Sequence, residues 1–151
     1  TVYKNFKDIN SIAHTHSLYA TSWAQSGRSI PCYGTTHADY YPKEIPITDL
    51  VNKKDLKKNY ETEIGNTILK KLKKIKVKAA NIPGVLALNH GVVAWGNTGK
   101  TAIENAIAIE FIAQLAFNSE LINRSVKKLP NDLHKKHYDR KHGKNSYYGQ
   151  K

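Results

Sequence analysis

The stretch Ile12-Ala13-His14-Thr15-His16-Ser17 predicts a β-strand that leads into a helix. Successive side chains of a strand point to opposite faces of its sheet, so His14 and His16 share a face. Two imidazoles held on one face of a strand supply two of the three ligands of an open, three-histidine zinc site. The alternative is a pair of solvated strand residues, because a His-x-His pattern is short and common.

His90 is the best candidate for the third ligand. It follows the apolar run Leu86-Ala87-Leu88 and precedes Gly91, which together predict a buried strand that ends in a turn. An ordinary loop histidine is the alternative interpretation. A zinc ion held by His14, His16 and His90 would keep one coordination position open, and it would act as a Lewis acid on a carbonyl oxygen.

The composition is that of one globular domain. The chain has 151 residues, of which 40% are hydrophobic and 24% charged, and this length allows a single hydrophobic core. No apolar run approaches the roughly 20 residues of a membrane helix, so no membrane partner is expected. The single cysteine, Cys32, excludes an internal disulfide and favours a reducing cytoplasm.

The chain starts at Thr1 and contains no methionine. This favours the interpretation that residues 1–151 form a single domain that is the C-terminal portion of a longer protein. Processing of a precursor is the alternative.

A formal net charge of +12 raises the question of nucleic-acid binding. Much of the positive charge lies in residues 53–78 and 127–144. In the first segment, lysines alternate with apolar residues in the pattern of an amphipathic helix, so a solvated lysine face is favoured. Interleaved aromatic residues, which single-strand binders use, are lacking. A nucleic-acid partner is therefore not expected, and a basic nucleic-acid binder ranks third among the functional alternatives.

Apolar periodicity and helix-start and helix-stop signals predict strands that alternate with helices, which is typical of an α/β fold. Strands are predicted at 11–16, 85–89 and 92–95, with shorter extended segments at 2–6 and around Tyr33. Helices are predicted at 18–25, 54–76, 99–117, 119–127 and 131–142. The helix at 99–117 is apolar over more than a narrow stripe, so we expect it to be largely buried against the sheet or a neighbouring subunit.

Three further segments bear on catalysis. Residues 94–101 read Ala-Trp-Gly-Asn-Thr-Gly-Lys-Thr, which lacks the first glycine of a phosphate-binding loop and argues against nucleotide hydrolysis. Asp39 lies in a polar loop that could reach the metal, where a carboxylate can move protons between oxygens. A simple turn cap is the alternative for Asp39. Tyr148 is a second potential proton donor, although a tail residue is by default disordered.

Several motifs closely resemble those of the L-ribulose-5-phosphate 4-epimerases of the class II aldolase/epimerase family. They include Ala-His-Thr-His-Ser at 13–17, Gly-Thr-Thr-His-Ala-Asp-Tyr at 34–40 and Asn-His-Gly at 89–91, together with the ending at 136–150. The resemblance covers essentially the whole chain. The motif at 34–40 favours the epimerases over aldolase relatives such as L-fuculose-phosphate aldolase.

The resemblance implies an α/β/α three-layer sandwich, here with an incomplete central sheet. It also implies a zinc-dependent cytoplasmic homotetramer, with active sites at subunit interfaces, that acts on a small sugar phosphate in pentose or arabinose metabolism. L-Ribulose 5-phosphate and D-xylulose 5-phosphate would be interconverted by breaking and re-forming the C3–C4 bond, as in an aldol cleavage.

Matching positions would assign His14, His16 and His90 to zinc. Asp39 would exchange a proton at the C4 oxygen, and Tyr148 of an adjacent subunit would be the second proton carrier. His137 would lie near the substrate.

The family has a further N-terminal part with phosphate-binding loops that the sequence lacks, so we expect a severe loss of activity. A class II aldolase and a non-catalytic zinc-binding or assembly fragment remain the alternatives.

Overall fold

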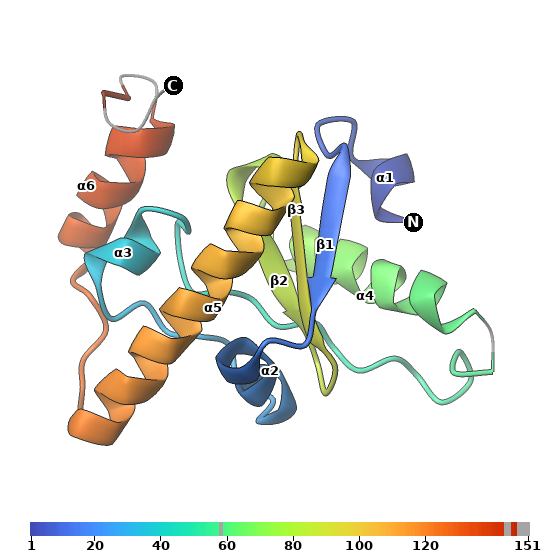
Figure 1. Cartoon of the computed structure of the whole chain (residues 1–151), viewed down its shortest axis with the longest axis horizontal. Helices are drawn as coiled ribbons and strands as arrows, with labels where there is room; N and C mark the ends of the chain where they lie inside the picture. The colour runs from blue at the N-terminus through green and yellow to red at the C-terminus, as the bar shows by residue number, and fades with distance from the viewer. Residues whose placement is uncertain (58, 144–145, 148–151) are drawn as a thin grey trace.

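The computed structural model of the chain describes residues 1–57, 59–143 and 146–147 (Figure 1). In chain order its elements are α1 (Val2–Asn5), β1 (Ser11–Thr15), α2 (Leu18–Gln25), α3 (Thr35–Ala38), α4 (Tyr60–Ile75), the 3-10 turn η1 (Ala79–Asn81), β2 (Gly84–Ala87), β3 (Gly91–Gly96), α5 (Gly99–Ile122) and α6 (Asn131–His142). The predicted bounds of α2 and α6 are confirmed.

A small antiparallel sheet lies at the centre, with strand order β1-β3-β2. Its register places His14 opposite Val93 and Leu86 opposite Val92. Ile47 extends the sheet beyond β2 through a parallel bridge to Leu86. Figure 1 shows α5 crossing the front of the sheet and α4 behind it. Helices on both faces of an incomplete sheet confirm the expected α/β/α arrangement.

The core lies between the sheet and the helices on its two faces. The strand residues Val85, Leu86 and Val92 are fully buried, and so is Ile109 of α5. The side of α4 that faces the sheet contributes Ile68, which is 1% exposed. Such side chains each contribute about 1.5–3 kcal/mol through burial. The sheet and α5 therefore form a rigid support for any residue at the strand ends.

Hydrogen bonds from tryptophan side chains link this core to its surroundings. The indole of Trp95 donates to the Ala79 carbonyl oxygen at 2.9 Å, and that of Trp23 donates to the Ala113 carbonyl oxygen at 3.1 Å. A buried indole N–H needs such a partner because its desolvation is otherwise uncompensated. The second bond joins α2 to α5.

Several predicted elements differ from those observed. Residues 2–5 form a helical turn instead of a strand, and Tyr33 is irregular because the local bridge joins Ile30 to Ile45. The long amphipathic helix starts at Tyr60 because the Asn59 side chain accepts a bond from the Thr62 N–H and caps it there. The predicted helix at 119–127 does not exist as a separate element, since α5 continues to Ile122.

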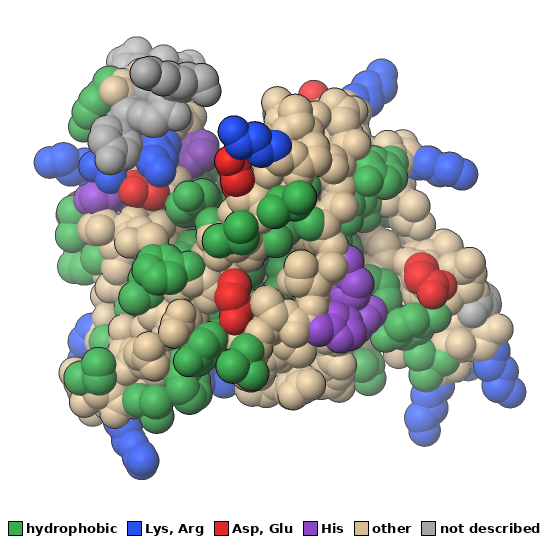
Figure 2. Space-filling model, in the orientation of Figure 1, with side chains coloured by type: hydrophobic (Ala, Val, Ile, Leu, Met, Phe, Trp, Pro, Cys, Tyr) green, Lys and Arg blue, Asp and Glu red, His purple; other side chains and the backbone are tan. Residues whose placement is uncertain are grey.

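Within the single chain only one side of α5 is buried, whereas the sequence predicts a helix largely buried against the sheet or a neighbouring subunit. The buried side consists mainly of alanine and isoleucine, which allow close approach to the sheet. The opposite side exposes large apolar side chains, including Ile103 (58%), Ile107 (63%) and Phe111 (52%). Figure 2 shows apolar side chains spread over this front surface.

In the described part of the chain, the helices are too short or too polar for any of them to cross a membrane.

Candidate functional site

The side chains of His14, His16 and His90, here called the histidine site, converge on one point. The Nε2 atom of His14 lies 3.1 Å from Nε2 of His16 and 3.2 Å from Nε2 of His90. One ligand atom from each residue lies within 4.8 Å of the other two. Tetrahedral zinc with Zn–N bonds of about 2.0–2.1 Å would separate its ligand nitrogens by about 3.3 Å. The three imidazoles therefore fit a single zinc ion.

The strand and its register orient His14. Its Nδ1–H donates to the Val92 carbonyl oxygen at 2.7 Å. Because a carbonyl can only accept, the proton is on Nδ1, and the lone pair of Nε2 faces the other two histidines. Alternation along β1 continues to His16, which therefore lies on the same face. This is the arrangement that the spacing predicts.

His90 lies in the tight turn between β2 and β3. Asn89 adopts a left-handed conformation with φ of 57°. A Cβ atom on Gly91 would lie 2.6 Å from the Thr15 carbonyl oxygen and 2.9 Å from Cδ2 of His16. Only glycine therefore allows the turn to approach the end of β1 closely enough for His90 to reach the other two rings.

The surroundings of His90 favour the neutral imidazole, which is the form that binds metals. Burial lowers its pKa from the ordinary value of 6.5, and His14 and His16 lower it further. Its Nδ1 is buried and has no hydrogen-bond partner among the described residues. His14 and His16 are exposed, so the site opens to solvent, and Figure 2 shows a group of histidine side chains at the surface.

Asp39 belongs to a separate group, here called the Asp39 cluster, with His137, Arg140 and Lys141 of α6. Nη2 of Arg140 donates to both carboxylate oxygens of Asp39, at 2.9 and 3.1 Å, and Nδ1 of His137 donates to Oδ1 at 3.1 Å. Lys141 Nζ lies 3.8 Å from Oδ2. The carboxylate side chain is only 13% exposed.

Opposing effects act on the pKa of Asp39. Burial alone would raise the pKa, but the hydrogen bonds from Arg140 and His137 and the charges of Lys141 and Arg140 lower it below its ordinary value of 3.8. Asp39 is therefore a carboxylate at neutral pH, which can accept a proton but does not carry one.

The structure does not bring the Asp39 cluster and the histidine site together within one chain. In Figure 1, α3 and α6 lie on one side of α5, whereas the end of β1 and the β2–β3 turn lie on the other. The expectation that the Asp39 loop can reach the metal therefore stays a prediction. His137 lies beside Asp39, also away from the histidine site. Tyr148 lies outside the described residues.

Sequence reasoning missed Arg140, the main partner of Asp39. An available signal was the basic ending of the last helix, Arg140-Lys141-His142, in a chain with 24 basic and 12 acidic residues. Such an ending also stabilises any helix C-terminus through the helix dipole, so it does not identify a partner by itself.

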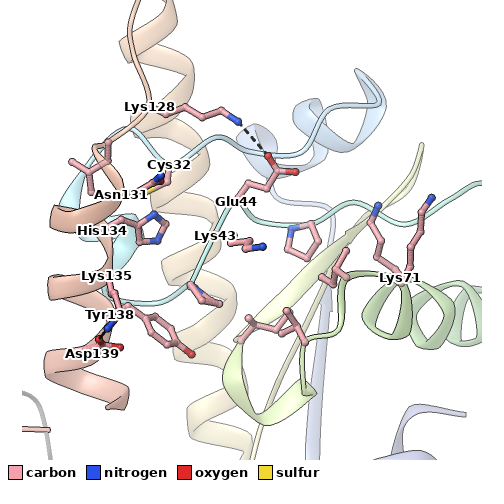
Figure 3. Close-up of a pocket in the computed structure, with 17 residues that line it drawn as sticks. Cys32, Lys43, Glu44, Lys71, Lys128, Asn131, His134, Lys135, Tyr138 and Asp139 are labelled. Atoms are coloured by element: carbon pink, nitrogen blue, oxygen red, sulfur yellow. Dashed lines mark hydrogen bonds and ion pairs between the residues drawn. The ribbon is translucent and has the colours of Figure 1, made fainter. Parts of the chain in front are cut away.

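A cleft of about 1000 Å³ lies between α4 and α6 (Figure 3). Lys43, Lys71 and Tyr138 contribute to its walls, but none of the predicted site residues that the structure describes does. Two of its lysines have acidic partners: Lys128 lies 3.6 Å from Glu44, and Lys135 pairs with Asp139. The cleft is therefore separate from both the histidine site and the Asp39 cluster.

Sequence comparisons match the chain to one protein family and to curated relatives that share a name. The family described as "Class II Aldolase and Adducin N-terminal domain" matches residues 1–117. L-ribulose-5-phosphate 4-epimerase UlaF of Salmonella paratyphi B is 38% identical over 150 residues, and the probable UlaF of Mycoplasma pneumoniae is 42% identical over 150 residues. The matches cover 99% of the chain but only 65% and 62% of these relatives. The chain thus spans a little under two thirds of the length of the curated relatives it matches.

Solved structures share the fold. An L-fuculose 1-phosphate aldolase superimposes with a TM-score of 0.68 at 18% identity, covering 91% of the chain and 58% of the aldolase. The L-fuculose 1-phosphate aldolase of Glaciozyma antarctica gives a TM-score of 0.67 at 15% identity, with 91% and 47% covered. At such low identity, the likeness is one of fold.

Proposed function

Because the chain belongs to the class II aldolase and adducin N-terminal domain family, we propose that it acts as an L-ribulose-5-phosphate 4-epimerase or as the C-terminal portion of one. The observation that carries the proposal is the convergence of the Nε2 atoms of His14, His16 and His90. The names of the relatives that are 38% and 42% identical support the choice of an epimerase.

The three histidines would hold zinc in an open site. When bound, the ion would supply Lewis-acid polarisation of the ketose carbonyl. The hydrogen bond from His14 Nδ1 to Val92 fixes the ring that would carry one ligand atom. The exposure of His14 and His16 leaves room for a ketose phosphate to approach.

Asp39 and Tyr148 would move the protons of the reaction. Cleavage of the C3–C4 bond requires that the C4 hydroxyl lose its proton while the bonding electrons pass into an enediolate of dihydroxyacetone. The ionised Asp39 carboxylate is suited to accept that proton, and Tyr148 is assigned the proton exchange on the opposite face. Re-addition to the other face of glycolaldehyde phosphate would complete the epimerisation, and His137 would lie near the substrate.

A second copy of the chain would be required to complete this site. Asp39 and the histidine site lie on opposite sides of α5 in one chain, so Asp39 would serve the histidine site of a neighbouring subunit. The exposed apolar side of α5, with Ile103, Ile107 and Phe111, supports burial in an assembly. We therefore propose a homotetramer with active sites at its interfaces.

Residues 1–151 would form one domain, corresponding to the C-terminal portion of the family domain. We place the protein in the cytoplasm, where the unpaired Cys32 would stay reduced. Burial raises the pKa of its thiol to about 11, so it is unreactive at neutral pH.

The test is to incubate the zinc-loaded protein with L-ribulose 5-phosphate and to follow the products by ¹³C NMR. Slow formation of D-xylulose 5-phosphate, in line with the expected severe loss of activity, and its abolition in His90→Ala are the expected results. Accumulation of glycolaldehyde phosphate would instead identify an aldolase. Stoichiometric zinc without any turnover would identify a non-catalytic zinc-binding or assembly role and would contradict the epimerase proposal.

A further inference from the structure

Glu110 of α5 binds the N-terminus of α2, directly after the strand that carries two of the histidines. Its Oε1 accepts a bond from the Tyr19 N–H and its Oε2 accepts one from the Ala20 N–H, both at 2.8 Å. Ser17, the N-cap residue of α2, makes no capping bond with its own side chain. A carboxylate from a distant helix therefore performs the capping that the local sequence does not.

The contact between Glu110 and the N-terminus of α2 holds α2 against α5. The carboxylate also faces the positive end of the α2 dipole, which strengthens the two bonds. One turn further along, the Trp23 indole donates to the carbonyl oxygen of Ala113 on α5. Glu110 and Ala113 are three residues apart and therefore lie on the same side of α5. Together they fix both the start and the middle of α2.

The other end of α2 holds the turn that carries the third histidine. The Asn89 N–H donates to the Ala24 carbonyl oxygen at 3.1 Å, and His90 is the next residue. At its start, α2 is connected to His16 through Ser17 alone. One short helix thus relates the strand histidines to the turn histidine.

We propose that Glu110 is a positioning residue for the histidine site, which it influences through α2. The proposal rests on the proposed metal site. By fixing the N-terminus of α2, the carboxylate sets the distance between the end of β1 and the Asn89–His90 turn, and so the separation of the Nε2 atoms. Sequence analysis gave no role to Glu110, because it lies 91 residues from Tyr19 in the chain.

The test compares Glu110→Gln with Glu104→Gln, a matched control on the same helix. Glu104 is exposed, and among the described residues it forms a long 3.8 Å pair with Lys100. In Glu110→Gln, one oxygen becomes an N–H₂ group that faces a backbone N–H, so a charge-assisted bond is lost. We expect zinc affinity to fall about tenfold, at the lower end of the effect of changing an outer-shell partner. The d–d spectrum of the cobalt-substituted protein should change as well, whereas Glu104→Gln should match the wild type in both.

Two further measurements separate positioning from general stability. In metal-free protein, hydrogen exchange at the Asn89 amide should accelerate about tenfold in Glu110→Gln, since the charge-assisted bond that anchors α2 is weakened. Ser17→Asn in the Glu110→Gln background supplies a local, uncharged cap and should restore zinc affinity to within about twofold.

The outcomes are distinguishable. If the wild type binds zinc and Glu110→Gln binds it equally tightly with the same cobalt spectrum, the positioning role is wrong. Unchanged exchange at Asn89 would also contradict it. If the wild type itself binds no zinc, the proposed metal site fails, and exchange at Asn89 alone decides whether Glu110 fixes the turn.

Discussion

The histidine site and the Asp39 cluster are built in different ways. The histidine site uses a strand and a tight turn, and a backbone carbonyl orients one of its rings. The Asp39 cluster depends on charged side chains that join α3 to α6, about 100 residues apart in the chain. Regular backbone geometry thus positions the side chains of the histidine site, whereas electrostatic pairing positions those of the Asp39 cluster.

The difference has a consequence for function. The histidine site opens to solvent through His14 and His16, so a cation can reach it directly. The Asp39 carboxylate is already satisfied by Arg140, His137 and Lys141, so it must exchange part of this pairing for substrate before it can move a proton. We expect the histidine site to be formed in an isolated chain, and the Asp39 cluster to act only across a subunit interface.

Removal of a histidine should give the largest effect. His14→Ala or His90→Ala leaves two ligands, so zinc affinity should fall by more than about 100-fold, the upper end of an outer-shell change. Zinc content after dialysis measures this. His137→Ala is the control from the Asp39 cluster and should keep its zinc. Equal zinc content in all three variants would show that the histidines do not form the metal site.

Gly91→Ala tests whether close backbone approach builds the histidine site. The added Cβ would lie 2.6 Å from the Thr15 carbonyl oxygen, so the turn or the strand must shift. We expect a loss of about 3 kcal/mol in the free energy of unfolding, at the upper end of typical overpacking, together with weaker zinc binding.

Gly34→Ala is the matched control, because a Cβ there has no neighbour within 4 Å. It should cost less than about 1 kcal/mol in urea unfolding. Similar losses in the free energy of unfolding for Gly91→Ala and Gly34→Ala would show that crowding by the added Cβ is not the reason for glycine at position 91.

Asp39→Asn tests the electrostatic pairing and its pH dependence. Replacing the carboxylate should cost about 2 kcal/mol at pH 7, because hydrogen bonds to a charged group are lost. The folded-state pKa of Asp39 lies below 3.8, so the stabilisation is complete above that value and is lost as the pH falls through the folded pKa. Urea unfolding at pH 7 and pH 3 should therefore show a smaller difference between wild type and variant at pH 3. A constant difference would exclude the ionised carboxylate as the cause.

Arg28→Ala should give the smallest loss of stability, and it tests how strongly burial affects the contribution of an ion pair. Arg28 pairs with Glu120 at 2.7 Å, which resembles the Asp39–Arg140 pair in geometry, but its side chain is 53% exposed. Solvent screening limits such a pair to less than about 1 kcal/mol. Thermal unfolding of Arg28→Ala and Arg140→Ala side by side checks the ranking, and an equal loss would contradict it.

Local patterns predicted the elements that carry the histidine site. The His-x-His spacing placed both rings on one face, helix-start and helix-stop signals gave the bounds of the following helix, and the apolar run before His90 predicted a strand and turn. These features were accessible because a strand has a period of two residues and because glycine marks turns. The start of α4 was misplaced, since apolar periodicity extends past the Asn59 cap into residues 53–57, which form turns.

The sequence by itself determined which side chains share a face of an element, and its motifs resembled those of a known family. Only the tertiary structure decided that Arg140 binds Asp39, that Glu110 caps α2, and that the two groups of site residues lie on opposite sides of α5. The physical reason is that periodicity fixes side-chain direction within one helix or strand. The relative placement of elements about 90–100 residues apart depends on how the whole core packs, which no local pattern encodes.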